Sequence, residues 1–407
     1  MNGSRLVPRK VWLILLVLVI AGLTAYQLLR PLPVVAATPL VHASEVVSGN
    51  APTIPLPPKG AAAVGTGELG ILGATTAQEP LPMASVAKLM TALVVTEDKP
   101  LAADDAGPTL VIDQSDVADY QARLAAGESV LKVAVGEQIT EYDALQGLLI
   151  PSGNNIAAVL AKWDAGSVGA MVEKLNARAA SMHLANTHFD DPAGVSPRTT
   201  STANDLFRIA VAAMKNKAIA KVVGSVQATL PVAGTVYNVD SVLGQDGIVG
   251  VKTGSGIGSA TGSLPISNFV FASKQTAGGQ PYLIVGAVMG QDTLADAFKA
   301  TLALIDAVKP AVQYQPYLAK GTSVATYQAP WGSKSDVQAT RFVSFFSWPG
   351  LALRRTATLA SVTAPVEAGR QVGHLSLELG DQSATVPLTT ASPLDKPGVR
   401  WRLTRAG

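Results

Sequence analysis

The first 30 residues combine a basic start with a long apolar run. Arg5, Arg9 and Lys10 precede a largely apolar stretch at residues 11–25, and residues 26–29 continue it only in part. A basic flank followed by such a stretch is typical of an export signal or a membrane-spanning helix, with the basic end kept in the cytoplasm. We therefore expect everything after about residue 30 to fold outside the cytoplasm.

The length of this run leaves the fate of the segment open. It lies between the apolar core of a signal peptide and the roughly 20 residues of a spanning helix. The Val-Ala-Ala sequence at 35–37 offers a small-residue cleavage site. Residues 1–30 are therefore either a signal peptide or an N-terminal membrane anchor, and an uncleaved segment would be the chain's contact with the membrane.

Composition limits the partners and the chemistry. A chain of 407 residues with 48% hydrophobic residues can bury a large core and a smaller one, which favours two folded domains. The chain has no cysteine, which excludes disulfides, thiolate nucleophiles and cysteine-based metal sites. Lys and Arg number 31 against 29 Asp and Glu, without a basic stripe, so we expect no nucleic-acid partner.

Three regions follow the apolar run. Residues 31–58 contain seven prolines, which predicts a Pro-rich extended connector. Residues 59–310 mix short strand-like runs with helical patterns, which predicts a mixed α/β domain. Residues 311–407 lose the helical period and alternate between strand-like runs and Gly or Pro turns, which predicts a β-rich C-terminal domain.

Local patterns predict individual elements. The clearest helical patterns span Ser85–Val95, Val168–Met182 and Thr202–Met214, and the expected C-terminal strands are Thr322–Tyr327, Gln338–Phe346, Arg355–Val362, Gln371–Leu379 and Ser383–Leu388. Thr140 and Thr202 are each followed three residues later by Asp, which resembles a capping box and predicts a helix start at each position.

Three short motifs occur in a set order: Ser-Val-Ala-Lys at 85–88, Ser-Gly-Asn at 152–154 and Lys-Thr-Gly at 252–254. Each motif alone is a weak signal, because Ser129 and Lys132 also have the spacing of the first motif and residues 48–50 repeat the second.

Local structure separates these motifs from their copies. Ser85 and Lys88 open a helical pattern, and residues three apart on a helix lie on one face. Ser129 and Lys132 lie in a strand-like pattern, where residues three apart point to opposite faces. The copy at 48–50 falls in the connector, whereas the motif at 152–154 falls between two expected helices.

The predicted chemistry is acyl transfer to a serine. The Ser85 hydroxyl needs a base, and Lys88 can serve if burial and a nearby cation such as Lys252 favour its neutral form. A helix start at Ser85 would also place backbone N–H groups where an oxyanion develops. Ser152 and Asn154 are candidates to relay a proton to the leaving amine and to hold the substrate amide.

Lys252 and Thr253 end a strand-like run and are candidates for binding a substrate carboxylate. Gly254 would leave room for close backbone approach. A rival group, His183, His188, Asp190 and Asp191, has neither a Gly-x-Ser-x-Gly elbow nor His-Glu-x-x-His spacing. We interpret these four residues as structural and expect no metal and no cofactor.

The motifs and their surroundings resemble the low-molecular-mass penicillin-binding proteins that act as serine-type D-alanyl-D-alanine carboxypeptidases. The similar segments are Pro82–Ala92, Leu148–Ala157, Thr187–Phe189, Asp191–Gly194, Ser201–Leu206 and Val366–Leu388. The resemblance implies a serine β-lactamase/transpeptidase-like catalytic domain of the mixed α/β (α+β) class, followed by a small all-β domain.

The same resemblance implies a role for each motif. Ser85 would be the acylated nucleophile and Lys88 its base, with Ser152 and Asn154 as the second motif. The set that would bind substrate is Lys252, Thr253, Gly254 and Ser255, with the backbone N–H groups of Ser85 and Ser255 forming the oxyanion hole. The implied substrates are peptidoglycan stem peptides ending in D-Ala-D-Ala, and β-lactams would acylate Ser85 as covalent inhibitors.

Two departures accompany the resemblance. Many relatives carry a C-terminal amphipathic membrane anchor, for which the last residues of this chain are too short. The run at 255–265 is also richer in Gly and Ser than the usual turn after this motif.

Other functions remain as alternatives. A D,D-endopeptidase would use the same site. A class A β-lactamase would need a suitably placed Glu, and Glu173 does not fit that pattern. A non-catalytic β-lactam sensor or cell-wall-binding scaffold is disfavoured, because only about ten residues precede the apolar run and both Ser85 and Lys88 are present.

Overall fold

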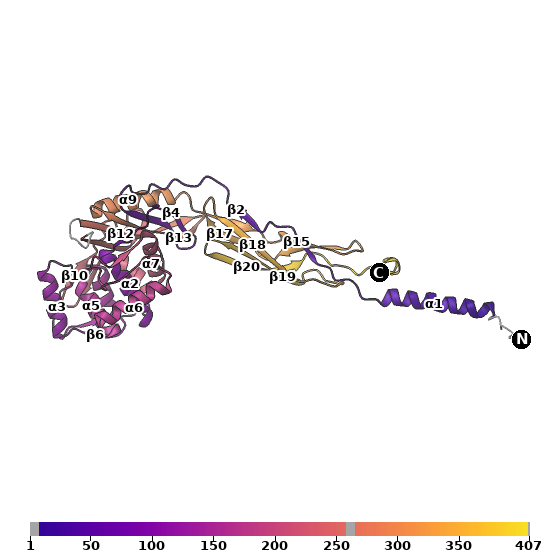
Figure 1. Ribbon diagram of the computed structural model, residues 1–407, viewed down its shortest axis with the longest axis horizontal. Helices are drawn as coiled ribbons and strands as arrows, with labels where there is room; N and C mark the ends of the chain where they lie inside the picture. The colour runs from indigo at the N-terminus through magenta and orange to yellow at the C-terminus, as the bar shows by residue number, and fades with distance from the viewer. Residues whose placement is uncertain (1–7, 258–264, 406–407) are drawn as a thin grey trace. The chain divides into compact units, whose positions relative to one another are not determined.

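The computed structural model describes residues 8–257 and 265–405 and separates into two compact units. The larger unit consists of Ser48–Tyr314 with Phe346–Gly350, and the smaller unit consists of Met1–Val47, Gln315–Phe345 and Leu351–Gly407. Figure 1 shows that most helices belong to the larger unit.

An antiparallel five-stranded sheet forms the centre of the larger unit. Its order is β11-β12-β13-β3-β4, and these strands span Ile248–Ile257, Pro265–Ala277, Gln280–Gln291, Ala61–Thr66 and Gly70–Ala74. Successive side chains of a strand point to opposite faces. Phe269 packs edge-to-face on Phe298, with ring centroids 4.9 Å apart, whereas the neighbouring Val270 belongs to the helical core on the other face. The sheet is therefore buried on both sides.

Helices cover both faces of this sheet. Figure 1 shows α9 (Leu294–Val308) on one side of β12 and β13, and α7 (Ala203–Lys215) on the other. The remaining helices are η1 (Ala84–Ala87), α2 (Lys88–Asp98), α3 (Gln114–Ala125), α4 (Glu141–Leu149), α5 (Asn154–Ala165), α6 (Val168–Ser181), α8 (Lys217–Val223) and η2 (Gln245–Gly247). Three short ladders complete the unit: β5 (Leu81–Pro82) with β8 (Thr200–Ser201), β6 (Thr109–Val111) with β7 (Gln138–Thr140), and β9 (Gln227–Leu230) with β10 (Gly234–Tyr237).

The two predicted helix starts are confirmed. Thr140 precedes α4, its hydroxyl accepts the backbone N–H of Asp143, and the Asp143 carboxylate accepts the backbone N–H of Thr140. Thr202 caps α7 by accepting the backbone N–H of Asp205. These bonds satisfy backbone donors that a helix start leaves free and so fix where each helix begins.

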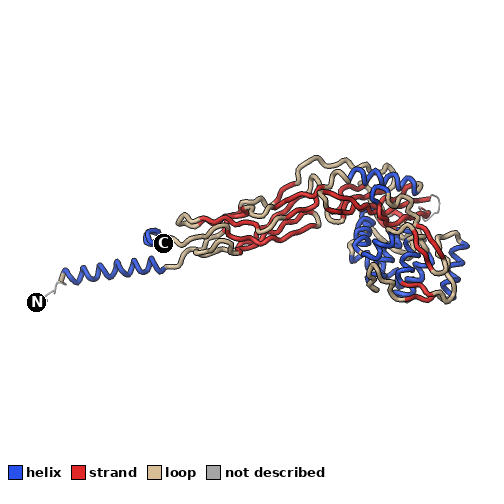
Figure 2. The backbone as a smooth tube through the Cα atoms, turned by 180° about the vertical axis from the view of Figure 1, so that it is seen from behind, coloured by secondary structure: helices blue, strands red, loops and turns tan. Residues whose placement is uncertain are grey.

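The smaller unit is built on a seven-stranded antiparallel sheet, drawn in red in Figure 2. Its order is β1-β15-β16-β20-β19-β18-β2, and these strands span Ala37–Pro39, Ser323–Gln328, Lys334–Ala339, Gln382–Thr390, Gln371–Leu379, Ala352–Leu359 and Ser44–Val46. A separate ladder joins β14 (Gln313–Leu318) and β17 (Val343–Ser347).

Both edge strands of this sheet come from the Pro-rich segment. β1 pairs with β15 and β2 pairs with β18. Part of residues 31–58 is therefore extended, as expected, but is also paired into the sheet. Strands of three residues give too little alternation to stand out in the sequence.

Among the predicted C-terminal strands, the one at 338–346 is wrong. The expected strand at 338–346 covers the end of β16, a bend at 340–341 and most of β17. The backbone N–H of Thr340 bonds to the Pro387 carbonyl, which turns the chain there. Ala339, Val343 and Phe345 all fall on odd positions and only Arg341 interrupts them, so the sequence pattern suggests one continuous strand.

The smaller unit also contains the N-terminal apolar helix α1 (Arg9–Leu29) and the short helix α10 (Val399–Thr404). Among residues 8–257 and 265–405, α1 is the one helix long and apolar enough to cross a membrane, with a mean hydropathy of 2.3 and none of its hydropathy window buried.

Candidate active site

The first motif forms a short 3₁₀ turn that leads into a helix. Ser85 lies in η1 and Lys88 is the first residue of α2. Lys88 Nζ lies 2.8 Å from Ser85 Oγ and donates a second hydrogen bond of 2.9 Å to the Ala193 carbonyl. The Lys88 side chain is fully buried. The spacing of three residues thus brings a hydroxyl and an amine into direct contact, as the sequence predicts.

The turn before Ser85 has unusual backbone geometry. Ala84 has a φ of +48°, a conformation that residues with a side chain rarely adopt. Gly194 also has a positive φ, and a Cβ at Gly194 would lie 1.8 Å from the Ala84 carbonyl oxygen. Only glycine at 194 therefore allows the two loops to meet. Strained backbone of this kind is often found at functional sites.

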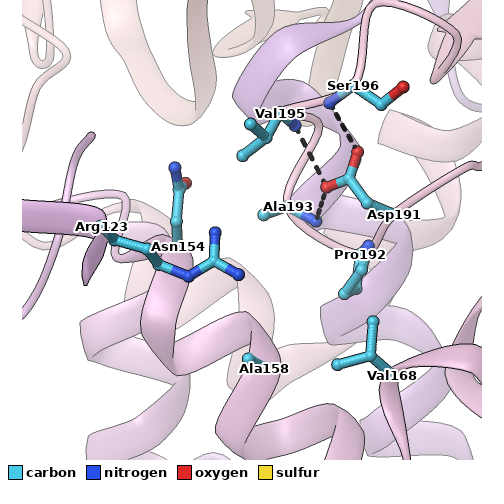
Figure 3. A pocket seen from close by; sticks show the side chains of 9 residues that line it. All are labelled: Arg123, Asn154, Ala158, Val168, Asp191, Pro192, Ala193, Val195 and Ser196. Carbon is cyan, nitrogen blue, oxygen red and sulfur yellow. Dashed lines mark hydrogen bonds between the residues drawn. The ribbon is translucent and has the colours of Figure 1, made fainter. Parts of the chain in front are cut away.

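The Asp191 carboxylate organises the loop that holds Lys88. It accepts the backbone N–H groups of Ala193, Gly194, Val195 and Ser196 and the hydroxyl of Thr199. Figure 3 shows three of these bonds converging on the carboxylate. The loop is fixed in this way, and with it the Ala193 carbonyl that accepts from Lys88. Asp191 therefore acts on the site through another residue.

Removal of this carboxylate is expected to damage both folding and the site. Asp191→Ala leaves four backbone donors without their acceptor and should lower the free energy of unfolding by about 2–4 kcal/mol. Chemical denaturation measures this loss. Asp190→Asn is the matched control, because Asp190 pairs with the exposed Arg198 and should change stability by less than about 0.5 kcal/mol. Equal effects of the two changes would contradict the role of Asp191.

Ser152 and Gly153 lie in the loop between α4 and α5, as predicted, and Asn154 is the first residue of α5. Ser152 and Asn154 are 5% and 6% exposed, and Ser152 has a φ of +67°. Neither Ser152 Oγ nor Asn154 Oδ1 has a hydrogen-bond partner among the described residues. Buried polar atoms are normally paired. These two atoms are therefore available for a substrate or for water.

Glu128, which the sequence analysis did not single out, fixes the amide of Asn154. Asn154 Nδ2 donates to Glu128 Oε2 at 2.8 Å, and Arg123 pairs with the same carboxylate oxygen at 2.8 Å. A carboxylate accepts only, so this contact holds the amide nitrogen toward Glu128 and leaves Oδ1 as the free atom. No sequence pattern marks Glu128, because its partner lies 26 residues away.

The copy of the first motif at 129–132 is not a strand, and that prediction is wrong. These residues have no regular secondary structure. The Ser129 carbonyl accepts the backbone N–H of Asn154, and the Asn155 side chain pairs with the backbone of Leu131. The loop is thus held against the start of α5 instead of joining a sheet. Ser129 and Lys132 are both exposed.

A cavity of about 310 Å³ opens beside Asn154. Figure 3 shows Arg123 and Asn154 on one side of it and the loop carrying Asp191 on the other. The full lining is Arg123, Asn154, Ala158, Val168, Asp191, Pro192, Ala193, Val195 and Ser196.

The third motif lies within β11. Lys252 and Thr253 are both buried. They lie in the middle of β11 and not at its end, as the sequence suggested, because the strand continues to Ile257. A Cβ at Gly254 would lie 2.8 Å from the Met83 carbonyl oxygen and 3.2 Å from the Val86 nitrogen, so a glycine is needed for β11 to approach η1. Ser255 follows at an exposed position. Residues 258–264 of the Gly- and Ser-rich run lie outside the described part of the chain.

Burial lowers the pKa of both lysines of the site. Burial lowers the pKa of Lys88 well below its ordinary value, and the Lys252 charge lowers it further. Burial lowers the pKa of Lys252 to about 7, although the Asp240 carboxylate opposes this shift. Burial and the Lys252 charge both favour the neutral form of Lys88, and that is the form a base requires.

Comparison with known proteins extends these observations. Residues 62–266, half of the chain, match the family described as D-alanyl-D-alanine carboxypeptidase (Peptidase_S11). A D-alanyl-D-alanine carboxypeptidase of Streptomyces sp. (strain K15) is 30% identical over 220 residues, which cover 52% of this chain and 72% of that protein. A D-alanyl-D-alanine endopeptidase of Pseudomonas aeruginosa is 37% identical over 132 residues, which cover 32% of this chain but only 39% of that protein.

A solved structure covers both units. Penicillin binding protein 5 from Haemophilus influenzae has a TM-score of 0.59 at 19% identity and covers 86% of this chain and 100% of its own. This likeness confirms the predicted fold class, a transpeptidase-like mixed α/β domain with a β-rich companion. The predicted family is confirmed as well: the chain belongs to the Peptidase_S11 family of D-alanyl-D-alanine carboxypeptidases.

Proposed function

We propose that the chain is a serine-type carboxypeptidase that removes the terminal D-Ala from peptidoglycan stem peptides ending in D-Ala-D-Ala. The observation that carries this proposal is the 2.8 Å contact between Ser85 Oγ and a fully buried Lys88. A buried amine whose pKa is lowered can take a hydroxyl proton at neutral pH.

Acylation begins with transfer of the Ser85 hydroxyl proton to Lys88 Nζ. Ser85 Oγ then attacks the carbonyl carbon of the penultimate D-Ala, and the carbonyl electrons move to its oxygen. The backbone N–H groups of Ser85 and Ser255 are the proposed donors to this oxyanion. The oxyanion electrons re-form the carbonyl and the peptide C–N bond breaks. Ser152 Oγ gives its proton to the leaving nitrogen and takes in its place the proton that Lys88 removed from Ser85, so free D-Ala departs and an ester remains on Ser85. Water then hydrolyses the ester and restores Ser85.

Substrate recognition falls to the second and third motifs. Lys252 and Thr253 bind the terminal carboxylate, because a cation and a hydroxyl next to it can both donate to a carboxylate. Gly254 keeps β11 close to the nucleophile turn. Asn154 Oδ1 is a buried acceptor to which no described residue donates, and it accepts a hydrogen bond from an N–H of the substrate peptide. β-Lactams acylate Ser85 by the same first step.

Release of D-Ala tests the proposal. The full chain in detergent should release one D-Ala from a synthetic stem peptide ending in D-Ala-D-Ala. The second candidate is D,D-endopeptidase activity, which the name of the Pseudomonas aeruginosa relative favours. Cleavage of a cross-linked peptide dimer without D-Ala release from the monomer would assign the site to the endopeptidase instead.

We expect Glu128 to act as a positioning residue for Asn154. Glu128→Ala frees the Asn154 amide to rotate and should slow acylation of Ser85 by a β-lactam by roughly 10- to 100-fold. Glu128→Gln keeps an acceptor oxygen and should recover part of the rate. Stopped-flow acylation with a chromogenic β-lactam measures both variants.

Asp119→Ala is the matched control for Glu128. Asp119 pairs with Arg123 at 2.7 Å, and no hydrogen bond between Asp119 and Asn154 is present in the described structure. The control should acylate at nearly the wild-type rate. If Asp119→Ala slows acylation as much as Glu128→Ala does, the charge network as a whole matters and the specific role of Glu128 is wrong.

A further inference from the structure

Two arginines of the last described segment bind the end of the apolar helix α1. Arg402 Nη1 donates to the Leu28 carbonyl at 2.6 Å. Arg405 donates to the carbonyls of Gln27 at 3.0 Å, Arg30 at 2.7 Å and Pro31 at 3.0 Å. All of these residues belong to the smaller unit. Residues about 375 positions apart thus form one structure at this end of α1.

These contacts satisfy groups that a helix end leaves free. The last four carbonyls of a helix have no partner within the helix, and its C-terminal end carries partial negative charge. A guanidinium group offers several N–H donors together with positive charge, so it suits both needs. Arg402 and Arg405 therefore cap α1 from a distant part of the chain.

Aromatic contacts fix this cap to the β-rich unit. The rings of Trp401 and Trp331 pack edge-to-face with centroids 5.1 Å apart, and the Arg405 guanidinium lies 5.6 Å from the centre of the Trp401 ring. Trp331 Nε1 donates to the Asp395 carbonyl at 2.7 Å. The cap is therefore attached to the turn between β15 and β16.

Three charges lie together at this end of α1 and form a cationic collar, which we define as Arg30, Arg402 and Arg405. A helix of 21 residues spans about 31 Å, close to the thickness of a bilayer core. The collar lies at the C-terminal end of the apolar stretch of α1. Trp401 precedes Arg402 in the sequence and its ring lies beside the Arg405 guanidinium. Basic side chains and tryptophan are the residues favoured at a membrane surface with acidic lipids.

Cleavage of α1 would disturb this arrangement. Val35, in the candidate cleavage site, is buried and bridges to Val362, and the next strand β1 pairs with β15. Loss of residues before this point would also remove every carbonyl that Arg402 and Arg405 bind.

We propose that α1 is retained as a membrane anchor and that the cationic collar binds the phosphate groups of acidic phospholipids. These lipids lie in the outer leaflet of the membrane that α1 spans. This inference is independent of the chemistry proposed at Ser85. The collar holds the β-rich unit at the lipid surface by contacts that a flexible tether would lack.

The first test is the intact mass of the full chain purified from the membrane of an expressing bacterium. A mass that includes residues 1–30 is expected, and a chain beginning near residue 37 would overturn the proposal. The second test is hydrogen–deuterium exchange of peptides covering 398–405, with the full chain in nanodiscs. Replacing phosphatidylglycerol with phosphatidylcholine should speed exchange at least threefold in wild type, and unchanged exchange would reject acidic-lipid binding.

A matched pair of double variants distinguishes the effect of the cap on α1 from the effect of removing positive charge. R402Q/R405Q and K396Q/R400Q each remove two positive charges, but the side chains of Lys396 and Arg400 make no hydrogen bond or ion pair with any described residue. In phosphatidylglycerol nanodiscs, R402Q/R405Q should speed exchange at 398–405 tenfold or more, and K396Q/R400Q by threefold or less. Equal effects would show that the cap on α1 contributes nothing. Acylation by penicillin should remain at the wild-type rate in both variants.

Discussion

Ser85→Ala is expected to abolish covalent labelling by penicillin and to lower D-Ala release by at least about 10⁴-fold. The reason is that no other described hydroxyl lies against the buried amine of Lys88. Loss of a serine nucleophile removes the entire covalent route, and what remains is catalysis by binding alone. Intact mass after incubation with penicillin gives the clearest measurement: wild type should gain one ligand mass, and the variant none.

The copied motif supplies the control for this experiment. Ser129→Ala with Lys132→Ala changes the same residue types at the same spacing, on exposed side chains. This double variant should be labelled as wild type is. Labelling of Ser85→Ala at the wild-type rate would mean that another residue is acylated, and the proposed mechanism would have to be abandoned.

Lys252→Gln is expected to lower the maximal rate by roughly 10²- to 10³-fold and to change its pH dependence. Lys88 acts as a base when neutral, so the rate should rise as pH increases through the lowered Lys88 pKa. Lys252 binds the carboxylate when charged, so the rate should fall as pH rises above about 7. The wild-type profile is then bell-shaped.

Removal of the Lys252 charge should change both the rise and the fall of the rate with pH. The decline above about pH 7 should disappear, because the group that titrates there is gone. The rising limb should move to higher pH, because Lys252 no longer helps to lower the pKa of Lys88. A kcat/KM profile between pH 5 and 10 measures both changes, with Lys132→Gln as an exposed control. A rising limb that stays in place would show that the two lysines are not coupled.

The sequence predicted the parts of this site that depend on short spacing. Ser85 and Lys88 meet because they are three residues apart at the start of a helix, and helix geometry alone determines that contact. The caps at Thr140 and Thr202 were predictable for the same reason. The family resemblance then assigned a role to each of the three motifs.

Contacts between distant segments could not be predicted in this way. Glu128 reaches Asn154, and the Ala193 carbonyl reaches Lys88 across 105 positions. Such pairs depend on how the loops fold together, and no local period encodes them. The failed strand prediction at 129–132 has the same cause, since Leu131 packs into the helical core and the segment joins no sheet.

The edge strands β1 and β2 have a consequence for the order of folding. They are the first strands to be synthesised, yet their partners β15 and β18 follow about 300 residues later. Pairing over such separations raises contact order and is slow, because a long loop must close before the contact forms. The seven-stranded sheet of the β-rich unit can therefore close only when the last part of the chain, which carries β15 to β20, is available. Until then its first strands present open hydrogen-bonding edges, which are the surfaces most prone to aggregation.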